Sequence, residues 1–334
     1  TARTNSFSYA TNAAATVTYN NDSASEDLAN ASTTFSNVAN LTIAANDGSS
    51  TVDYDWDLAS LAGGTALTDL TLTTGSDTET LDTGAITAAN LENWTITADD
   101  GNITVDTFAG AGELKTLTIN NANTASLGHV AVGAIGGTTA ADELTAFNVT
   151  TLGTADAGGS TQVTVTSLAA AGSTFTFDMN LAGDYGTSTL GATTGASISA
   201  MNITTGTLGT ALNVDTFTIT GDYGDVTISV GDAFDGDDDF LSTTGASKSV
   251  GNVSLSTSAL ALNIAEGAGE TFIDGATTVG NVTLTASSAA SSINIGQFEE
   301  ATTVGNITFT GTGSIVWDGA GAATSVGNIS GSVA

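Results

Sequence analysis

A short motif recurs along almost the whole chain, and this repeat constrains the fold more than any other feature. Each copy has an apolar residue, two further residues, a second apolar residue, then Thr, Ser or Asn, a third apolar residue, and Thr or Ser. The clearest copies occupy residues 250–256, 279–285, 304–310 and 326–330. About twelve copies fall between residues 41 and 329, at a mean spacing of about 26 residues. A repeat of this length predicts a stack of similar units, each buried by its neighbours.

The alternation inside each copy predicts strands. Apolar and polar residues alternate with period two, which is typical of a half-buried strand. A second alternating stretch follows many copies, and Gly, Asn, Asp and Ser gather between the stretches, as turns require. We therefore predict an all-β fold, a parallel β-helix (β-solenoid) of about twelve coils with roughly 26 residues per coil. An all-β sandwich is the competing fold, but the fixed register of the repeated Val-Gly-Asn unit favours the solenoid.

The repeat also suggests how the chain is divided. Residues 1–37 lack the motif and are predicted to form an N-terminal entry strand or cap, available to a neighbouring subunit, while residues 38–334 form the solenoid. If Phe217 marks a copy of the motif, the spacing from the copy at Met201 is 16 residues and the spacing to the copy at Val253 is 36 residues. The long step predicts an acidic loop insertion at about residues 229–249, because insertions in solenoids become loops on one face.

Composition excludes several classes of function. The 334 residues include 35 Asp and Glu but 3 Lys and Arg, which gives a net charge of −32. Such a chain repels nucleic acid, and without a run of about 18 apolar residues we expect no membrane insertion. Cys is absent and His129 is the one histidine, which argues against thiolate chemistry and a Ser-His-Asp triad. No spacing selects a pair of catalytic carboxylates, so we expect that the protein is not an enzyme.

Acidic residues gather at two places that suit a hard cation. Hard oxygen ligands at flexible spacing are typical of Ca²⁺, which takes six to eight of them. The first candidate group lies in the predicted insertion and comprises Asp232, Asp235, Asp237, Asp238 and Asp239. The second comprises Asp53, Asp55 and Asp57, which would share one face of a strand about 7 Å apart. A solvated acidic loop and an exposed strand face are the alternative interpretations.

Threonines between the apolar positions predict a polar outer sheet. The expected pairs are Thr71 and Thr73, Thr95 and Thr97, Thr218 and Thr220, Thr283 and Thr285, and Thr308 and Thr310. A flat Thr-x-Thr grid resembles the ice-binding face of some antifreeze proteins. Here Asn120, Asn148, Asp178 and Asn202 interrupt the grid, and Thr is also simply a good exposed strand residue.

Asparagine recurs at one position of the motif. The copies are Asn40, Asn93, Asn252, Asn281, Asn306 and Asn328. Stacked side-chain amides can form ladders, and Asn also tolerates left-handed backbone geometry at corners. The same residues fit Asn-x-Ser/Thr sequons, which would allow glycan attachment along a suitable secretory route.

The chain resembles bacterial S-layer proteins and related secreted β-solenoid proteins of the cell surface. The resemblance rests on the Ala, Thr, Gly, Asn, Ser and Asp bias, the scarcity of Lys, the absence of Cys and repeats such as residues 278–285. It implies an extracellular location at the cell surface and self-assembly into a surface layer, sheath or filament, often ordered by Ca²⁺. Glycine-aspartate nonapeptides of the RTX type and a cell-wall anchoring domain are not recognisable in the sequence.

Physical reasoning about open strand edges also favours self-assembly. The chain begins at Thr1 rather than Met, so it is expected to be processed or a fragment of something longer. The last copy stops soon after its first strand without a visible capping element, and an uncapped edge can accept the edge of another copy. Head-to-tail contacts that do not close produce filaments, and cations would then screen the charge. The alternatives are a monomeric adhesin stalk, an ice-binding solenoid and a polysaccharide-active β-helix enzyme.

Overall fold

The protein is all-β and folds as a β-solenoid of about 10 turns, with about 25 residues in each turn. The computed structural model describes residues 3–21, 31–47, 55–75, 80–99, 101–122, 129–151, 162–181, 188–206, 212–231, 234–236, 239–244, 248–258, 261–265 and 270–333. The chain divides into two compact units, Thr1–Gly172 and Ser173–Ala334. The predicted fold class is confirmed.

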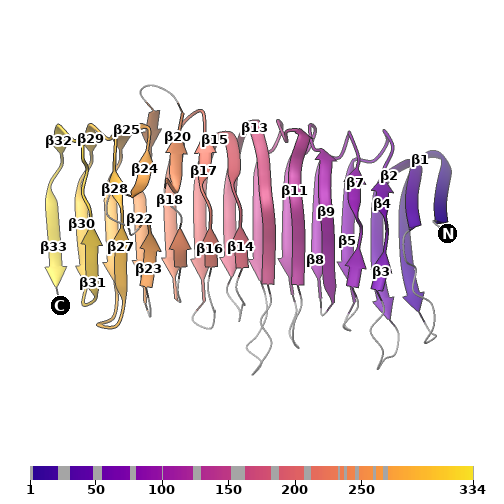
Figure 1. The fold of residues 1–334 in the computed structure, drawn as a ribbon, viewed down its shortest axis with the longest axis horizontal. Coiled ribbons are helices and arrows are strands. Elements are labelled where there is room, and N and C mark those ends of the chain that lie inside the picture. The colour runs from indigo at the N-terminus through magenta and orange to yellow at the C-terminus, as the bar shows by residue number, and fades with distance from the viewer. Residues whose placement is uncertain are drawn as a thin grey trace. The chain divides into compact units, whose positions relative to one another are not determined.

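Unit 1 is built from strands that pair in parallel with the strand one turn away (Figure 1). Its strands are β1 (Arg3–Asn21), β2 (Ala31–Asp47), β3 (Asp55–Asp57), β4 (Ser60–Ala62), β5 (Asp69–Thr74), β6 (Thr80–Asp82), β7 (Ala85–Thr87), β8 (Asn93–Ala98), β9 (Asn102–Gly110), β10 (Thr116–Asn121), β11 (His129–Thr139) and β12 (Ala146–Thr151). Strand β13 (Gln162–Leu181) runs across the division between the units.

Unit 2 repeats the same parallel stacking. Its strands are β14 (Ser188–Leu190), β15 (Thr193–Thr205), β16 (Leu212–Val214), β17 (Phe217–Ile219), β18 (Tyr223–Val230), β19 (Phe234–Gly236), β20 (Leu241–Thr243), β21 (Lys248–Val250), β22 (Val253–Thr257), β23 (Ala261–Ile264), β24 (Thr271–Asp274), β25 (Ala276–Val279), β26 (Val282–Ala286), β27 (Ser292–Ile295), β28 (Gln297–Phe298), β29 (Thr303–Val304), β30 (Ile307–Gly311), β31 (Ser314–Trp317), β32 (Ser325–Val326) and β33 (Ile329–Val333).

The strands that carry the repeat stack on one another, and we call this set the motif column. In unit 1 the first apolar residues of the strands are in register: Leu41, Leu70, Trp94, Leu117 and Phe147. In unit 2 the corresponding residues are Met201, Val226, Val253, Val282, Ile307 and Ile329. All of them except Ile329 are buried. Apolar residues therefore form the interior, and each turn covers the apolar residues of the turn before it.

The interior of unit 2 contains a continuous row of aromatic rings. Ring centroids lie 5.2 Å apart for Phe177–Phe217, 5.8 Å for Phe217–Phe240, 6.1 Å for Phe240–Phe272, 5.8 Å for Phe272–Phe298 and 5.2 Å for Phe298–Trp317. These separations lie in the range in which aromatic pairs attract beyond their buried area. The row reaches the last described turn through Trp317.

The predicted insertion is a regular turn of the stack. Phe217 pairs with Thr193 and Leu241, so it belongs to a different column, and Val226 is the motif residue that follows Met201. Residues 229–249 contain β19, β20 and β21, each paired with the turn on either side. The expected insertion was wrong because two strands of one turn both alternate with period two, and periodicity alone does not tell the columns apart.

Within residues 1–37, strand β1 and the beginning of β2 join the stack as well. Strand β1 pairs in parallel with β2 over residues 3–8 and 13–21, with register shifts between Ser8 and Ala14. The pairing places Ala15 beside Leu41 and Val17 beside Ile43, which are motif positions. The N-terminal segment is thus an entry strand that continues the motif column of unit 1.

Candidate assembly interface

The last described turn of unit 2 leaves its apolar residues uncovered. Strand β33 pairs with β30 along one edge, and no described strand of the chain pairs with its other edge. Ile329 is 64% exposed, whereas Ile307, its partner one turn earlier, is 0% exposed. Val326 is 39% exposed, and its partner Val304 is 2% exposed. An unpaired strand edge with exposed apolar residues is a template for another strand.

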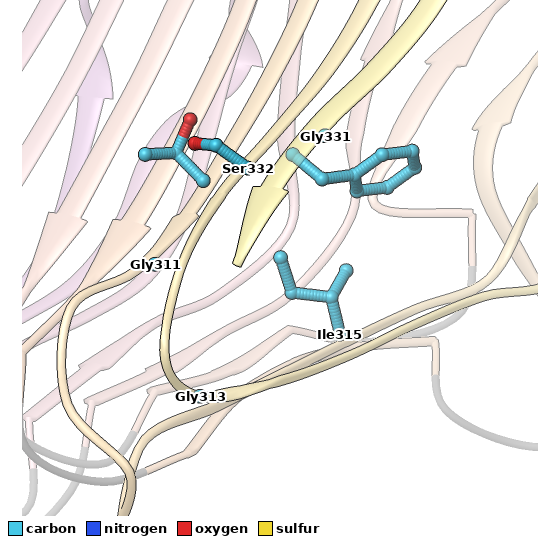
Figure 2. Close-up of a pocket in the computed structure, with 7 residues that line it drawn as sticks. Gly311, Gly313, Ile315, Gly331 and Ser332 are labelled. Carbon is cyan, nitrogen blue, oxygen red and sulfur yellow. The ribbon is translucent and has the colours of Figure 1, made fainter. Parts of the chain in front are cut away.

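A hollow opens beside this edge because the motif changes in the last copy. Gly331 takes the position that Phe309 and Leu284 hold in the two preceding turns. A cavity of about 330 Å³ results, lined by Phe309, Thr310, Gly311, Gly313, Ile315, Gly331 and Ser332. Figure 2 shows Ile315 beside the strand that carries Gly331 and Ser332.

Asparagine side chains form a ladder along the same corner of unit 2. The N–H of Asn281 donates to Asn252 Oδ1 at 3.1 Å, that of Asn306 to Asn281 Oδ1 at 3.0 Å, and that of Asn328 to Asn306 Oδ1 at 3.0 Å. At the other end, Asn252 donates to Asp225 Oδ1 at 2.8 Å. The predicted ladder is confirmed for Asn252, Asn281, Asn306 and Asn328, and Asn328 is its last described member.

Hydrogen bonding rather than left-handed geometry explains these asparagines. In the described part of the chain, the non-glycine residues with positive φ are Asn37, Asp239 and Ala265, and none of them belongs to the ladder. Unit 1 has a shorter counterpart, in which Asn93 Nδ2 donates to Asp69 Oδ1 at 2.8 Å.

The first strand of unit 1 presents a second partly open edge. Strand β1 pairs with β2 on one side, and Phe7 is 37% exposed while its ring stacks on Phe35 at 5.1 Å between centroids. Ala15 is buried, Val17 is half-buried, and Thr16 and Thr18 are exposed. The strand keeps the alternation of the repeat, so its edge has the pattern that a further turn would need.

Two residues of the first group of predicted calcium ligands, Asp235 and Asp239, lie in the described part of the chain. The side chain of Asp235 is exposed in β19 between buried Phe234 and Gly236. Asp239 lies in a turn with φ 55°, and its N–H donates to the carbonyl oxygen of Thr271 at 2.7 Å. Asp232, Asp237 and Asp238 lie outside the described residues. Within the ranges given above, no group of three or more His, Asp or Glu is arranged to hold a metal ion.

The second acidic group is described in part. Asp55 and Asp57 lie in β3, and Asp53 is outside the described residues. Asp57 is in register with Asp82 of the next turn, whose Oδ1 accepts the N–H of Gly84 at 2.9 Å. The carboxylate of Asp82 therefore has a structural role at a corner.

The polar outer face of the motif column is continuous within each unit. In unit 1, Thr42, Thr71, Thr95, Thr118 and Asn148 form one row, and Ala44, Thr73, Thr97, Asn120 and Thr150 form the next. In unit 2 the rows are Asn202, Thr227, Ser254, Thr283, Thr308, Ser330 and Thr204, Ser229, Ser256, Thr285, Thr310, Ser332. Thr218 and Thr220 do not belong to them: Thr218 pairs with Thr194 and Ser242 in another column.

Positive charge is confined to a few places. Lys115 Nζ lies 3.0 Å from Glu92 Oε1 and 3.9 Å from Glu143 Oε2 at the surface of unit 1. The hydrogen bond to Glu92 raises the pKa of Lys115, although desolvation opposes this. The remaining cations are Arg3 in β1 and Lys248 in β21. The salt bridge joins three neighbouring turns and contributes little stability, because it is exposed.

Comparison with known proteins finds no matching family model, no matching curated protein and no matching solved structure. No helix among the described residues is long and apolar enough to cross a membrane.

The sequence did not reveal the most distinctive residues of the interface. Ile329 and Val326 have the same identities as buried residues of other copies, so sequence alone does not show that they are exposed. The signal for the hollow was present: the copy ending at Ser332 reads Ile-Ser-Gly-Ser, whereas the preceding copy reads Ile-Thr-Phe-Thr. A glycine at an inward motif position marks a missing core side chain.

Proposed function

We propose that the protein is a non-enzymatic structural protein of the cell exterior that assembles with copies of itself into a surface layer, sheath or filament. The observation that carries this proposal is the parallel stacking of similar turns, in which each turn buries the apolar residues of the turn before it, because a contact of this kind can be repeated between copies. Burial of apolar surface and completion of a strand edge favour the addition of another strand. The composition shared with S-layer proteins supports an extracellular role.

Calcium ions are proposed to bridge carboxylates of neighbouring copies. A chain with net charge −32 repels its copies, so assembly needs cations that screen or bridge the charge. Carboxylates contributed by two copies can complete the six to eight oxygen ligands that Ca²⁺ takes. Asp235 is exposed and thus accessible to such an ion.

Negative-stain microscopy with millimolar Ca²⁺, and again after chelation, tests the proposal. Ordered filaments or sheets that dissolve with chelator are the expected result. Protein that stays monomeric at every Ca²⁺ and salt concentration contradicts the proposal. A monomer that binds a defined surface ligand would instead be an adhesin, and release of reducing ends from a glycan would identify an enzyme.

The polar face of the motif column supports a second candidate function, ice binding. Its two rows in unit 2 consist of Thr, Ser and Asn from Asn202 and Thr204 onward, and two carboxylates border them: Asp178, which accepts a hydrogen bond from Asn202, and Asp225, which pairs with Ala200. Strands about 4.8 Å apart make such rows regularly spaced in two directions. Thermal hysteresis of the dissolved protein is the measurement that separates this function from assembly.

A further inference from the structure

We propose that the outer face of the motif column in unit 2 is a lateral contact, against which the same face of a second copy of the chain packs. This inference rests on the proposed self-assembly and names a surface that joins neighbouring copies side by side. The surface covers three successive turns, and we call it the neutral face. It consists of Asn252, Ser254, Ser256, Asn281, Thr283, Thr285, Asn306, Thr308 and Thr310.

The residues of the neutral face alternate with the core residues of the same strands. In β26, Val282 and Leu284 are buried, whereas Thr283 and Thr285 point outward. Strand β22 has the same burial pattern. Because the strands pair in register, Thr283 lies between Ser254 and Thr308 of the neighbouring turns. Rows of short polar side chains therefore run across the turns.

Negative charge is kept away from the neutral face. Between residues 248 and 312, the carboxylates in the described ranges are Glu270, Asp274, Glu299 and Glu300. All four lie in or within two residues of β24 and β28, which pair with each other in another column. The neutral face has no charged residue, in a chain with 35 Asp and Glu.

This charge distribution identifies a second copy as the occupant of the face. A chain with net charge −32 repels its copies wherever carboxylates face one another. The repulsion falls off over a screening length of about 8 Å at physiological ionic strength. Two copies therefore approach most easily through a surface that carries no charge of its own. A basic partner would instead bind where the carboxylates lie.

Short side chains allow two neutral faces to approach closely. Parallel strands in register present rows of like side chains, and such rows on facing sheets interdigitate in dry contacts. Facing sheets pack about 10 Å apart. A two-fold axis makes the contact self-complementary, because both copies then use the same patch. Thr283 occupies the middle row of the middle turn, so it lies near its equivalent in the second copy.

The polar groups of the face can keep hydrogen-bond partners when the contact excludes water. Ser256 Oγ donates to Ser229 Oγ of the preceding turn at 3.0 Å, and Asn281 Nδ2 donates to Asn252 Oδ1 at 3.2 Å. A Thr hydroxyl both donates and accepts, so Thr283 can bond to hydroxyl groups of the opposite face. These bonds avoid the cost of burying unpaired polar groups.

The neutral face is small for a contact between two proteins. Three rows about 6.8 Å apart and three turns about 4.8 Å apart give roughly 300 Å² per copy. A stable complex of two proteins buries about 800 Å² per partner. The contact is therefore weak by itself and becomes stable when many copies in a layer or bundle repeat it.

Chemical cross-linking tests the contact directly, because the native chain contains no Cys. Thr283→Cys places a thiol at the centre of the neutral face, and Asn294→Cys places one on the outer side of β27, in another column. Both variants of the full chain are assembled with Ca²⁺ and treated with a bismaleimide about 10 Å long, the separation of facing sheets. We expect a covalent dimer from Thr283→Cys and about tenfold less dimer from Asn294→Cys.

A matched pair of lysine variants tests the energetic role of the face. Thr283→Lys brings the ammonium groups of two copies together inside the contact, and Asn294→Lys adds the same charge outside it. Calcium does not bridge ammonium groups, so Ca²⁺ does not mask the effect. Burying an unpaired ammonium is costly, so Thr283→Lys should raise the protein concentration at which sheets or bundles form by about tenfold or more. Asn294→Lys should raise it less than about threefold, because its charge stays in water.

The outcomes separate this inference from the proposed function. If both cysteine variants cross-link equally, or both lysine variants associate like the native chain, the contact face is wrong while self-assembly stands. If Thr283→Lys removes thermal hysteresis that the native chain shows and leaves association unchanged, the face binds ice and the inference is overturned. If the native chain does not assemble under any of the Ca²⁺ and salt conditions, the proposed function itself is overturned. Circular dichroism of each variant confirms that the fold is kept before assembly is compared.

Discussion

Glycine at the corner of each C-terminal turn is required by its distance to the preceding turn. A Cβ at Gly280 would lie 2.7 Å from the carbonyl oxygen of Gly251, and one at Gly305 would lie 2.7 Å from that of Gly280. The N–H of Gly280 points into the same space, at 3.0 Å from Val250 O and 3.1 Å from Gly251 O. The glycine of the recurrent Val-Gly-Asn sequence is therefore needed because the backbones of neighbouring turns approach closely there.

We predict that the buried Tyr223 makes the free energy of unfolding depend on pH. It is 2% exposed, and its hydroxyl donates to the carbonyl oxygen of Phe217 and lies 3.2 Å from that of Ser242. Burial raises the pKa of Tyr223 well above its ordinary value, and the hydrogen bond to Ser242 opposes this. Tyr223→Phe should lower the free energy of unfolding by about 1–2 kcal/mol at pH 8, since a buried hydrogen bond is lost.

The stability that Tyr223 contributes should fall at high pH. Above pH of about 10 the unfolded chain releases the tyrosine proton while the folded chain keeps it, so the folded state loses stability as pH rises. The difference in the free energy of unfolding between the native chain and Tyr223→Phe should shrink by about 1 kcal/mol between pH 10 and pH 11. Urea unfolding of both proteins at pH 8, 10 and 11 measures this. A difference that stays constant would contradict the predicted ionisation.

At the scale of the element, the asparagine ladder links successive strands of the motif column. Each member offers an Oδ1 that accepts the N–H of the next turn, and some members also donate from Nδ2, as Asn281 does to Asn252 at 3.2 Å. The bonds recur once per turn at the same corner. The ladder thus reinforces the register that the buried apolar residues set.

We predict that a substitution within the ladder costs more than one at its end. Asn281→Ala removes the donor to Asn252 and the acceptor for the N–H of Asn306, and it should destabilise the fold by about 1 kcal/mol. Asn328→Ala is the matched control, because no described turn follows Asn328, and it should cost about 0.5 kcal/mol or less. Chemical unfolding of the isolated protein measures both. Equal losses for the two variants would show that the ladder does not bind turns together.

At the scale of the whole molecule, charge opposes both folding and assembly. The chain carries 35 acids against 3 Lys and Arg, and within the described ranges the one network of ion pairs is that of Lys115 with Glu92 and Glu143. Most carboxylates therefore repel one another without a fixed counter-charge.

We predict that salt stabilises the isolated protein. Raising NaCl from 0.01 M to 0.5 M shortens the screening length from about 30 Å to about 4 Å and weakens the repulsion. The unfolding temperature should rise by roughly 3 °C or more, which calorimetry at low protein concentration measures. CaCl₂ at matched ionic strength is the control: extra stabilisation shows bound calcium, and equal stabilisation shows screening alone. An unfolding temperature that does not rise with NaCl would contradict the prediction.

Periodicity and composition by themselves determined that this protein is a parallel β-solenoid with polar outer rows and an asparagine ladder. These features depend on short-range alternation and on a repeat, and both are visible along the chain. The tertiary structure alone decided which strands share a column. Phe217 and Val226 begin equally plausible alternating strands, and pairing with the turns on either side distinguishes them. It alone also decided that Ile329 is exposed, because burial in a solenoid is supplied by the neighbouring turn and not by the residue itself.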